Sequence, residues 1–306
     1  MSFTITLSLV ATMLIYAIPA FLLIKTKLAK ESSIPGIAAI LLYICTPSII
    51  INAILQAEFN NDTLLDLLIF SALALVIQAI VFGGSYLILR RRFNDARARV
   101  ASVASALGNY GFFGIPLLTG LMPNNPEAVV YTAIMSIFLN FIAFTFGSML
   151  ISGDAKYVSV KKLFLNPSVL PAIVAIPLFV TNVRLPDQIM SILELFQTIS
   201  TPLCMFVLGM RLATVKLSDV FGNPYSYFSV VAKQIIMPLI ALAFVHLLPC
   251  NPVMEQSLVI MCSCPIASVI LNISEILENG QKHAVNVVLL GTILSIVTIP
   301  FIMLLY

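Results

Sequence analysis

The sequence is dominated by apolar runs that are long enough to cross a lipid bilayer. Only 9% of the 306 residues are charged, whereas an ordinary soluble domain carries about 25%. A spanning helix needs about 20 mainly apolar residues. The hydrophobic content of 60% and the mean hydropathy of +1.07 therefore predict a protein of the bilayer. This composition excludes soluble enzymes, disordered tails and proteins with a nucleic-acid partner.

The apolar runs predict an all-α, polytopic membrane protein with ten transmembrane helices. The runs are continuous rather than alternating, which excludes a β-barrel. Unbroken helices satisfy their own backbone groups in lipid, so hydropathy is a usable guide to their positions. The expected spans are 3–24, 35–57, 64–89, 98–122, 127–152, 168–182, 188–210, 225–248, 253–276 and 283–305.

The basic residues predict the orientation. Fourteen of the sixteen Lys and Arg residues fall in the odd-numbered loops, the exceptions being Arg184 and Lys233. Because basic loops are retained in the cytoplasm, we expect a multi-pass protein of the plasma or inner membrane with both termini on the extracellular or periplasmic side. The fourteen are Lys25, Lys27, Lys30, Arg90, Arg91, Arg92, Arg97, Arg99, Lys156, Lys161, Lys162, Arg211, Lys216 and Lys282.

Two halves of the chain are related by a weak repeat. Thr46-Pro47 recurs as Thr201-Pro202, and Gln78 corresponds to Lys233, both at an offset of 155. Five spans per half is an odd number, so the halves would insert with opposite orientations. We therefore expect one five-helix repeat over residues 1–153 and a second, inverted one over residues 160–306.

Spans four and nine carry the features that disrupt helices. The segment Gly108–Pro116 contains three glycines, Gly108, Gly111 and Gly114, and one proline. Pro265 interrupts span nine. Such residues destabilise a helix by about 1 kcal/mol per Gly and about 3 for Pro. Two breaks at corresponding positions of inverted halves indicate a substrate site at mid-membrane, and half-helix N-termini there favour an anion. The simpler alternative is that both prolines only kink packed helices.

The residues around the breaks are the candidate site. Asn109 could hydrogen-bond a carboxylate or the freed backbone, and the intramembrane Lys233 has either an anion or coupling role or an anchoring role. Aromatic neighbours such as Tyr110 serve packing or recognition. The predicted substrate-binding residues are Asn109, Tyr110, Gly111, Gly114, Pro116, Ser263, Pro265, Ser268 and Lys233. Asn140, Gln234 and Asn272 are candidates for ion coupling or plain interhelical hydrogen bonds.

No catalytic or metal-binding pattern is expected. The five cysteines suggest no disulfide framework, and the Cys262-x-Cys264 pair is too apolar for a zinc site. His246 and His283 fall near opposite membrane faces. We find no phosphate loop or nucleophile elbow and expect neither an enzyme nor a bound metal or cofactor.

Several strings of residues resemble the auxin efflux carrier family, which includes plant PIN-type carriers and a bacterial malate or malonate permease-like branch. The similarity extends over nearly the whole chain, and the short loop between spans five and six is similar to the bacterial branch. The strings are Tyr43–Pro47, Gly108–Pro116, Lys162–Pro167, Leu185-Pro186, Thr201–Gly209 with Leu212, Pro238, Pro265 with Ala267, and Thr292–Pro300.

The resemblance implies a fold like that of bile-acid sodium symporters, with two inverted repeats whose fourth helices are broken and cross. It implies a scaffold domain of spans 1, 2, 6 and 7, commonly a homodimer, and a transport domain of spans 3–5 and 8–10 that moves as an elevator. It also implies organic-anion substrates. Coupling to H⁺ or Na⁺ is left open.

The resulting hypothesis is a secondary active transporter for a small carboxylate such as malate, malonate or an auxin-like acid. The alternative is a ligand-gated channel or membrane sensor that binds a carboxylate without coupled transport.

Overall fold

The structure is a computed structural model that describes residues 3–56, 61–125, 128–154, 156, 169–183, 185–248 and 251–306. These residues form helices and turns, with one isolated β-bridge between Gly108 and Ile266. Seven helices in the described part are long and apolar enough to span a membrane. The all-helical, multi-span architecture is therefore confirmed. Lys161, Lys162, Arg184, Cys250 and the string 163–167 lie outside the described residues.

The seven candidate spans match seven of the ten expected runs. Their bounds are Phe3–Lys25, Glu31–Leu55, Leu64–Arg92, Ala128–Ser152, Asp187–Thr214, Pro224–Leu247 and Gln281–Leu305. The first span comprises α1 (Phe3–Ile15) and α2 (Ala17–Lys25), and the second comprises η1 (Glu31–Ser33), α3 (Ile34–Ile40), η2 (Leu41–Cys45) and α4 (Thr46–Leu55). The third comprises α5 (Asn61–Leu89) and η3 (Arg90–Arg92), and the fourth comprises α8 (Ala128–Ile142), η5 (Ala143–Gly147) and α9 (Ser148–Ser152). The fifth is α12 (Asp187–Thr214), the sixth comprises α14 (Pro224–Val231), η7 (Ala232–Ile236) and α15 (Met237–Leu247), and the seventh is α18 (Gln281–Leu305).

The other three expected runs are shorter or divided. Run 98–122 is split into α6 (Ala96–Ala104), η4 (Tyr110–Gly114) and α7 (Ile115–Leu121). Run 253–276 is split into α16 (Pro252–Ser263) and α17 (Val269–Ile276). Run 168–182 contains the twelve-residue helix α11 (Val169–Val180). The arrangement of ten spans as inverted repeats therefore stays a prediction.

Three of the expected runs contain a π-helical turn shortly before a proline. The turns η2, η4 and η7 each end two residues before Pro47, Pro116 or Pro238. Proline has no N–H and its ring clashes with the carbonyl four residues earlier. A wider π turn relieves this conflict and lets the helix continue into its next segment.

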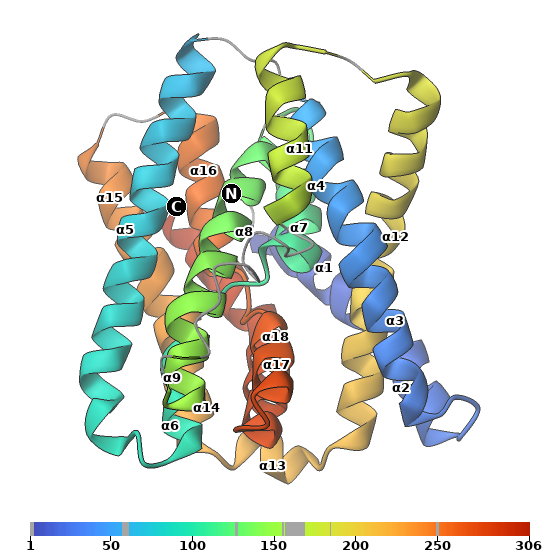
Figure 1. Cartoon of the computed structure of the whole chain (residues 1–306), viewed down its shortest axis with the longest axis vertical. Coiled ribbons are helices and arrows are strands. Elements are labelled where there is room, and N and C mark those ends of the chain that lie inside the picture. Colours follow the sequence, from blue (N-terminus) through green and yellow to red (C-terminus); the bar gives the residue numbers. More distant parts are fainter. Residues whose placement is uncertain are drawn as a thin grey trace.

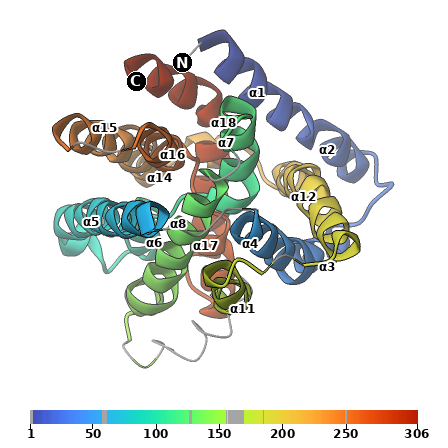
Figure 2. The same ribbon diagram turned by 90° about the horizontal axis from the view of Figure 1, so that it is seen from above.

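The helices gather into two groups with a central layer between them (Figures 1 and 2). Helix α12 packs against α2 and α4, and α11 packs against α4. On the other side, α15 packs against α5 and α16, and α14 against α6 and α18. Figure 2 shows α7, α8, α17 and α18 between these groups, where the two divided spans meet.

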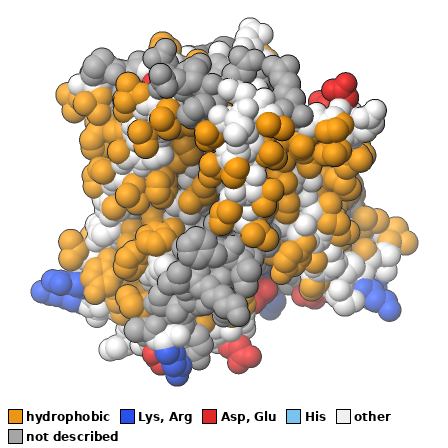
Figure 3. Space-filling model, turned by 45° about the horizontal axis from the view of Figure 1, so that its top comes forward, with side chains coloured by type: hydrophobic (Ala, Val, Ile, Leu, Met, Phe, Trp, Pro, Cys, Tyr) orange, Lys and Arg blue, Asp and Glu red, His pale blue; other side chains and the backbone are white. Residues whose placement is uncertain are grey.

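Basic residues gather at one end of the molecule. The turns after α2 and α5 and the short helix α13 (Leu217–Phe221) lie at the lower end in Figure 1. Figure 3 shows Lys and Arg side chains along this lower edge, below a broad hydrophobic band. We call this end the basic end. The band has the apolar surface that a helical protein presents to lipid.

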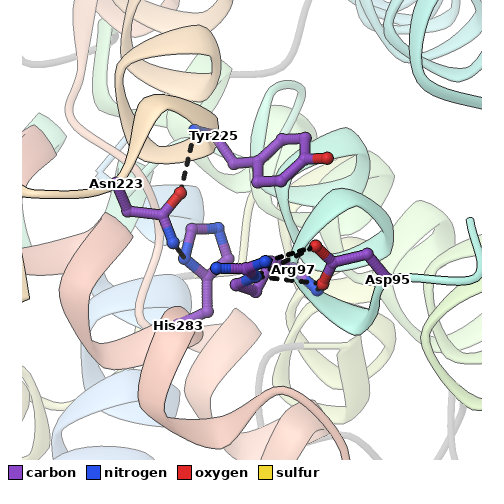
Figure 4. A network of polar contacts seen from close by, with 5 residues as sticks. All are labelled: Asp95, Arg97, Asn223, Tyr225 and His283. Carbon is purple, nitrogen blue, oxygen red and sulfur yellow. Dashed lines mark hydrogen bonds and ion pairs between the residues drawn. The ribbon is translucent and has the colours of Figure 1, made fainter. Parts of the chain in front are cut away.

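A polar network joins three helices at the basic end (Figure 4). Asp95 caps α6 by accepting from the Arg97 backbone N–H at 2.9 Å, and it also accepts from the Arg97 guanidinium. That guanidinium lies over the Tyr225 ring of α14, at 5.8 Å from its centroid. Asn223 caps α14 and contacts His283 of α18, with 3.3 Å between Nδ2 and Nδ1. The network thus holds α6 against α14 and α18.

Candidate functional site

The first break, residues 105–109 between α6 and η4, and the second break, residues 264–268 between α16 and α17, meet through their backbones. The Asn109 N–H donates to the Pro265 carbonyl at 2.7 Å, and the Ala267 N–H donates to the Leu107 carbonyl at 2.9 Å. These bonds form an antiparallel bridge between unwound segments that are far apart in the sequence. We call this meeting point of the two breaks the crossing. Non-helical backbone at membrane depth needs partners from the protein or from a water-filled cavity. Here each break supplies partners to the other.

Gly108 and Gly111 have different surroundings. A Cβ added at Gly108 would collide with the Tyr110 ring and come within 2.7 Å of Lys233 Cε, whereas one added at Gly111 would meet no atom within 4 Å. Gly108 therefore permits close packing behind the break. Gly111 faces open space, and any side chain there would project into the cavity described below.

Lys233 lies behind the crossing and is fully buried. Its Nζ donates to the Cys262 carbonyl at 2.7 Å and to the Cys264 carbonyl at 3.0 Å, and it lies 5.5 Å from the centroid of the Tyr110 ring. The C-terminal end of a helix carries partial negative charge on its free carbonyls. The Lys233 ammonium therefore neutralises the end of α16 at the break.

A cavity of about 1450 Å³ extends from the basic end to the crossing. It is lined along the second span from Glu31 to Ala53, and along α8 from Thr132 to Asn140. This volume exceeds the range of about 300–1,000 Å³ that is usual for a small-molecule site. The cavity is therefore large enough to serve as a vestibule as well as a binding site.

The cavity reaches the first turns of both half-helices that start at the breaks. Its walls there include Asn109, Tyr110 and Gly111 from the first break, and Ala267 and Ser268 from the second. The first N–H groups of a helix have no intrahelical partner, and the positive end of the helix dipole lies with them. Both half-helices thus present their positive ends to the cavity.

The predicted substrate-binding residues divide into two sets. Asn109, Tyr110, Gly111 and Ser268 line the cavity. The remainder are not among its lining residues; they are Gly114, Pro116, Ser263, Pro265 and Lys233. Among these, Ser263 is fully buried and donates to the Val259 carbonyl within its own helix.

Two of those residues shape the crossing without facing the cavity. The Pro265 carbonyl accepts the bond from Asn109 N–H. A Cβ at Gly114 would come within 3.0 Å of Met261 and 3.1 Å of Cys264. This glycine therefore permits the close approach of η4 and the end of α16.

The three ion-coupling candidates do not share one place. Asn140 and Asn272 line the cavity, and Asn140 Nδ2 donates to the Ser136 carbonyl at 2.7 Å. Gln234 is fully buried instead, donating to the Gly291 carbonyl at 2.7 Å and accepting from the Thr298 hydroxyl at 2.8 Å. The contacts of Gln234 are those of an interhelical link.

The charged residues of the cavity lie toward the basic end. Lys282 pairs with Asp219 at 2.7 Å, and its ammonium holds the pKa of the Asp219 carboxyl below the usual value. Arg211 pairs with Glu275 at 3.3 Å. Around the crossing itself, the described lining residues are polar or apolar but uncharged. An anion there would depend on N–H groups, side-chain amides and hydroxyls.

Sequence reasoning missed Gly108 as a separate packing position and Arg211 as a cavity residue. The collision at Gly108 depends on how Tyr110 folds toward Lys233, which no local pattern reveals. Arg211 follows the expected span seven, where its charge predicts only a basic loop residue. Its position at the expected end of a span does not indicate that it faces a cavity.

A family comparison adds the decisive observation. The model of a family described as membrane transport protein matches residues 4–303. The chain belongs to this family. The resemblance to auxin efflux carriers is thereby confirmed, and membership in this family indicates a membrane transporter rather than an enzyme. Comparison with curated proteins finds no match.

Proposed function

We propose that the protein is a secondary active transporter of a small organic anion, with a carboxylate bound at the crossing of the two breaks. The observation that carries this proposal is the pairing of two unwound segments beside a cavity that both half-helix N-termini line. Helix N-termini stabilise anions through unpaired N–H groups and the helix dipole. Asn109 and Ser268 add a side-chain amide and a hydroxyl.

The electrostatics at the crossing support an anion rather than a cation. Carbonyls at the C-terminal end of α16 would attract a cation, but those of Cys262 and Cys264 accept hydrogen bonds from Lys233. The Leu107 carbonyl beyond α6 accepts from Ala267. The first residues of both half-helices thus line the cavity, while these carbonyls are occupied. In this role Lys233 contributes positive charge without touching the substrate.

We propose alternating access by an elevator-type motion. The scaffold would comprise α1–α4, α11 and α12, and the transport domain the remaining spans, which include both breaks. The close packing of α12 against α2 and α4 supports a rigid scaffold. The network of Figure 4, which joins α6, α14 and α18, supports a transport domain that moves as a unit.

The proposal includes two inverted repeats, over residues 1–153 and 160–306, and both termini outside the cell. The basic end would then face the cytoplasm, and the cavity would be open to that side. Assembly as a homodimer through the scaffold, and coupling to H⁺ or Na⁺, are further parts of the proposal.

Counterflow in proteoliposomes tests this function. Labelled malate, malonate and indole-3-acetate are offered to liposomes preloaded with the same unlabelled acid. We expect saturable uptake of at least one acid and stimulation by the preloaded acid. Asn109→Ala should reduce this uptake, whereas Asn94→Ala removes an exposed Asn outside the cavity and should not.

Two results would overturn the proposal. One is the absence of saturable uptake for all three acids by a folded protein. The other is a unitary current through single molecules without stimulation by preloaded acid, which would indicate the alternative channel.

A further inference from the structure

The mouth of the cavity contains an ion pair that bridges two separate parts of the fold. Arg211, in the last turn of α12, donates from Nη1 to Glu275 Oε1 of α17 at 3.3 Å. Both residues line the cavity. Helix α12 belongs to the proposed scaffold, whereas α17 begins at a break and belongs to the proposed transport domain. The pair therefore joins the proposed scaffold to the proposed transport domain at the cavity mouth, where a substrate would enter.

The Arg211 guanidinium is incompletely bonded. Charge-assisted N–H···O bonds are usually about 2.7–2.9 Å, and an Arg commonly holds a carboxylate through two parallel bonds. Arg211 has a single, longer bond to Glu275. Its Nε is buried and has no hydrogen-bond partner within the described residues. A planar guanidinium with an unused N–H donor can bind a carboxylate through two parallel hydrogen bonds, which is a better geometry than its single bond to Glu275.

The arrangement of polar residues on α17 places Arg211 apart from the crossing. Ser268, Asn272 and Glu275 are four and three residues apart, so they share one face of the helix, and all three line the cavity. At a rise of about 1.5 Å per residue, Glu275 lies about 10 Å along the axis from Ser268. A small carboxylate bound at Arg211 would thus lie nearer the cavity mouth than the crossing does, with Asn272 between the two positions.

The other charged residues at the cavity mouth balance one another in number. Lys282 and Asp219 neutralise each other at 2.7 Å. Lys216 and Glu31 also line the mouth, with opposite charges. In the Arg211–Glu275 pair the Glu275 side chain is 51% exposed and the Arg211 side chain 16% exposed. The carboxylate of Glu275 can therefore move into solvent while the guanidinium stays in the wall.

We propose that Arg211 is a separate anion-binding site at the cavity mouth, which receives the carboxylate of the substrate before the crossing does. Glu275, which pairs with Arg211, acts as a tethered competitor at this site and is displaced by the carboxylate of the substrate. The inference rests on the proposed function, because it concerns the entry of the same carboxylate substrate.

The competitor role predicts opposite effects for the two partners. Initial rates of labelled malate, malonate and indole-3-acetate uptake are measured in vesicles whose outer solution faces the cavity mouth. Arg211→Gln should raise KM about tenfold, the effect of losing one hydrogen bond to a charged group. Glu275→Gln should lower KM, because the internal carboxylate no longer competes. Arg91→Gln and Glu278→Gln, which change exposed residues outside the cavity, should leave KM unchanged.

A purely structural ion pair would behave differently. Both substitutions break the same pair, so KM would then change in the same direction for both, or not at all, and either result would overturn the proposal. Arg211→Lys keeps the charge without the planar fork and should give an intermediate KM. If Arg211→Gln does not fold, Glu275→Gln alone decides, since an unchanged or raised KM contradicts competition.

Failure of the proposed function would give a different result, because the wild-type protein itself would then show no saturable uptake of the three acids. Failure of the Arg211 proposal leaves wild-type uptake intact and alters only the pattern of the variants.

Discussion

The two breaks contribute to the same cavity but hold their backbones in different ways. At the second break, the buried Lys233 ammonium bonds the carbonyls of Cys262 and Cys264. At the first break, the Leu107 carbonyl accepts from a backbone N–H, that of Ala267. The residue expected to match Lys233 in the first half is Gln78, which is uncharged and donates to the Ala74 carbonyl at 3.3 Å and to Met135 Sδ at 3.7 Å.

This difference shows that two spans interrupted in a similar way can carry a buried charge on one side only. A buried ammonium is costly unless it is well hydrogen-bonded, and Lys233 has two carbonyl partners and an aromatic ring. The uncharged first break instead relies on the second for backbone partners. The buried positive charge beside the proposed anion site therefore comes from the second half of the chain.

The largest effect is expected from removing that charge. Lys233→Met leaves two buried carbonyls without their donor, and hydrogen bonds to charged groups contribute about 1.5–3 kcal/mol each. We expect loss of carboxylate uptake and a clearly lower melting temperature. Gln78→Met, the change at the position expected to match it in the first half, removes two long bonds from an uncharged donor and should cost about 1 kcal/mol or less.

Thermal unfolding in detergent and counterflow uptake measure this contrast. Lys30→Met removes an exposed Lys that does not line the cavity and serves as a control for the loss of one positive charge. Equal losses for Lys233→Met and Gln78→Met would show that the two breaks are held in equivalent ways, against the comparison above.

A second, smaller contrast lies within the first break. Gly108→Ala forces a Cβ against Tyr110 and Lys233, and such overpacking costs about 1–3 kcal/mol. Gly111→Ala places its methyl group in open space, so it should leave the melting temperature nearly unchanged and act on uptake. Thermal unfolding of the two variants side by side decides. A Gly108→Ala protein as stable as Gly111→Ala would contradict the packing described here.

The sequence allowed the positions of the breaks to be predicted better than their lining. Glycines and prolines act on their own local backbone, so helix interruptions near 108–116 and at Pro265 could be anticipated. Whether a residue faces the cavity depends on how distant helices pack. Ser263 and Ser268 are both small and polar, yet only Ser268 lines the cavity. The partners of Lys233 likewise depend on the approach of α16, which is distant in sequence.

Cysteine accessibility sharpens the comparison between the faces of the second break. In a background with Cys250 replaced by Ser, Ser268→Cys should react with a water-soluble thiol reagent, because position 268 lines the cavity. Ser263→Cys should react far more slowly, since position 263 is fully buried. Cys45, Cys204, Cys262 and Cys264 are buried and should give little background. Labelling followed by mass spectrometry gives the two rates, and equal rates would contradict the assigned cavity wall.

The smallest expected effect separates the helices that lead into the two breaks. Asp95 caps α6 with a charged side chain, whereas Asn251 caps α16 with a neutral one. The hydrogen bond from the Arg97 guanidinium holds the pKa of Asp95 below its usual value. A lowered pKa in the folded state means that this stabilisation is complete above the unfolded value of about 3.9 and is lost as the pH falls through the folded value.

Asp95→Asn keeps a capping side chain but removes this titration. The variant should therefore be slightly less stable than the wild type at pH 6. The difference should begin to shrink as the pH falls below about 3.9 and vanish once the pH is below the folded pKa of Asp95. Melting temperatures measured across this range provide the test. A difference that persists undiminished at the acidic end would mean that the Asp95 carboxylate does not stabilise α6 through Arg97, and that the two leading helices are capped alike.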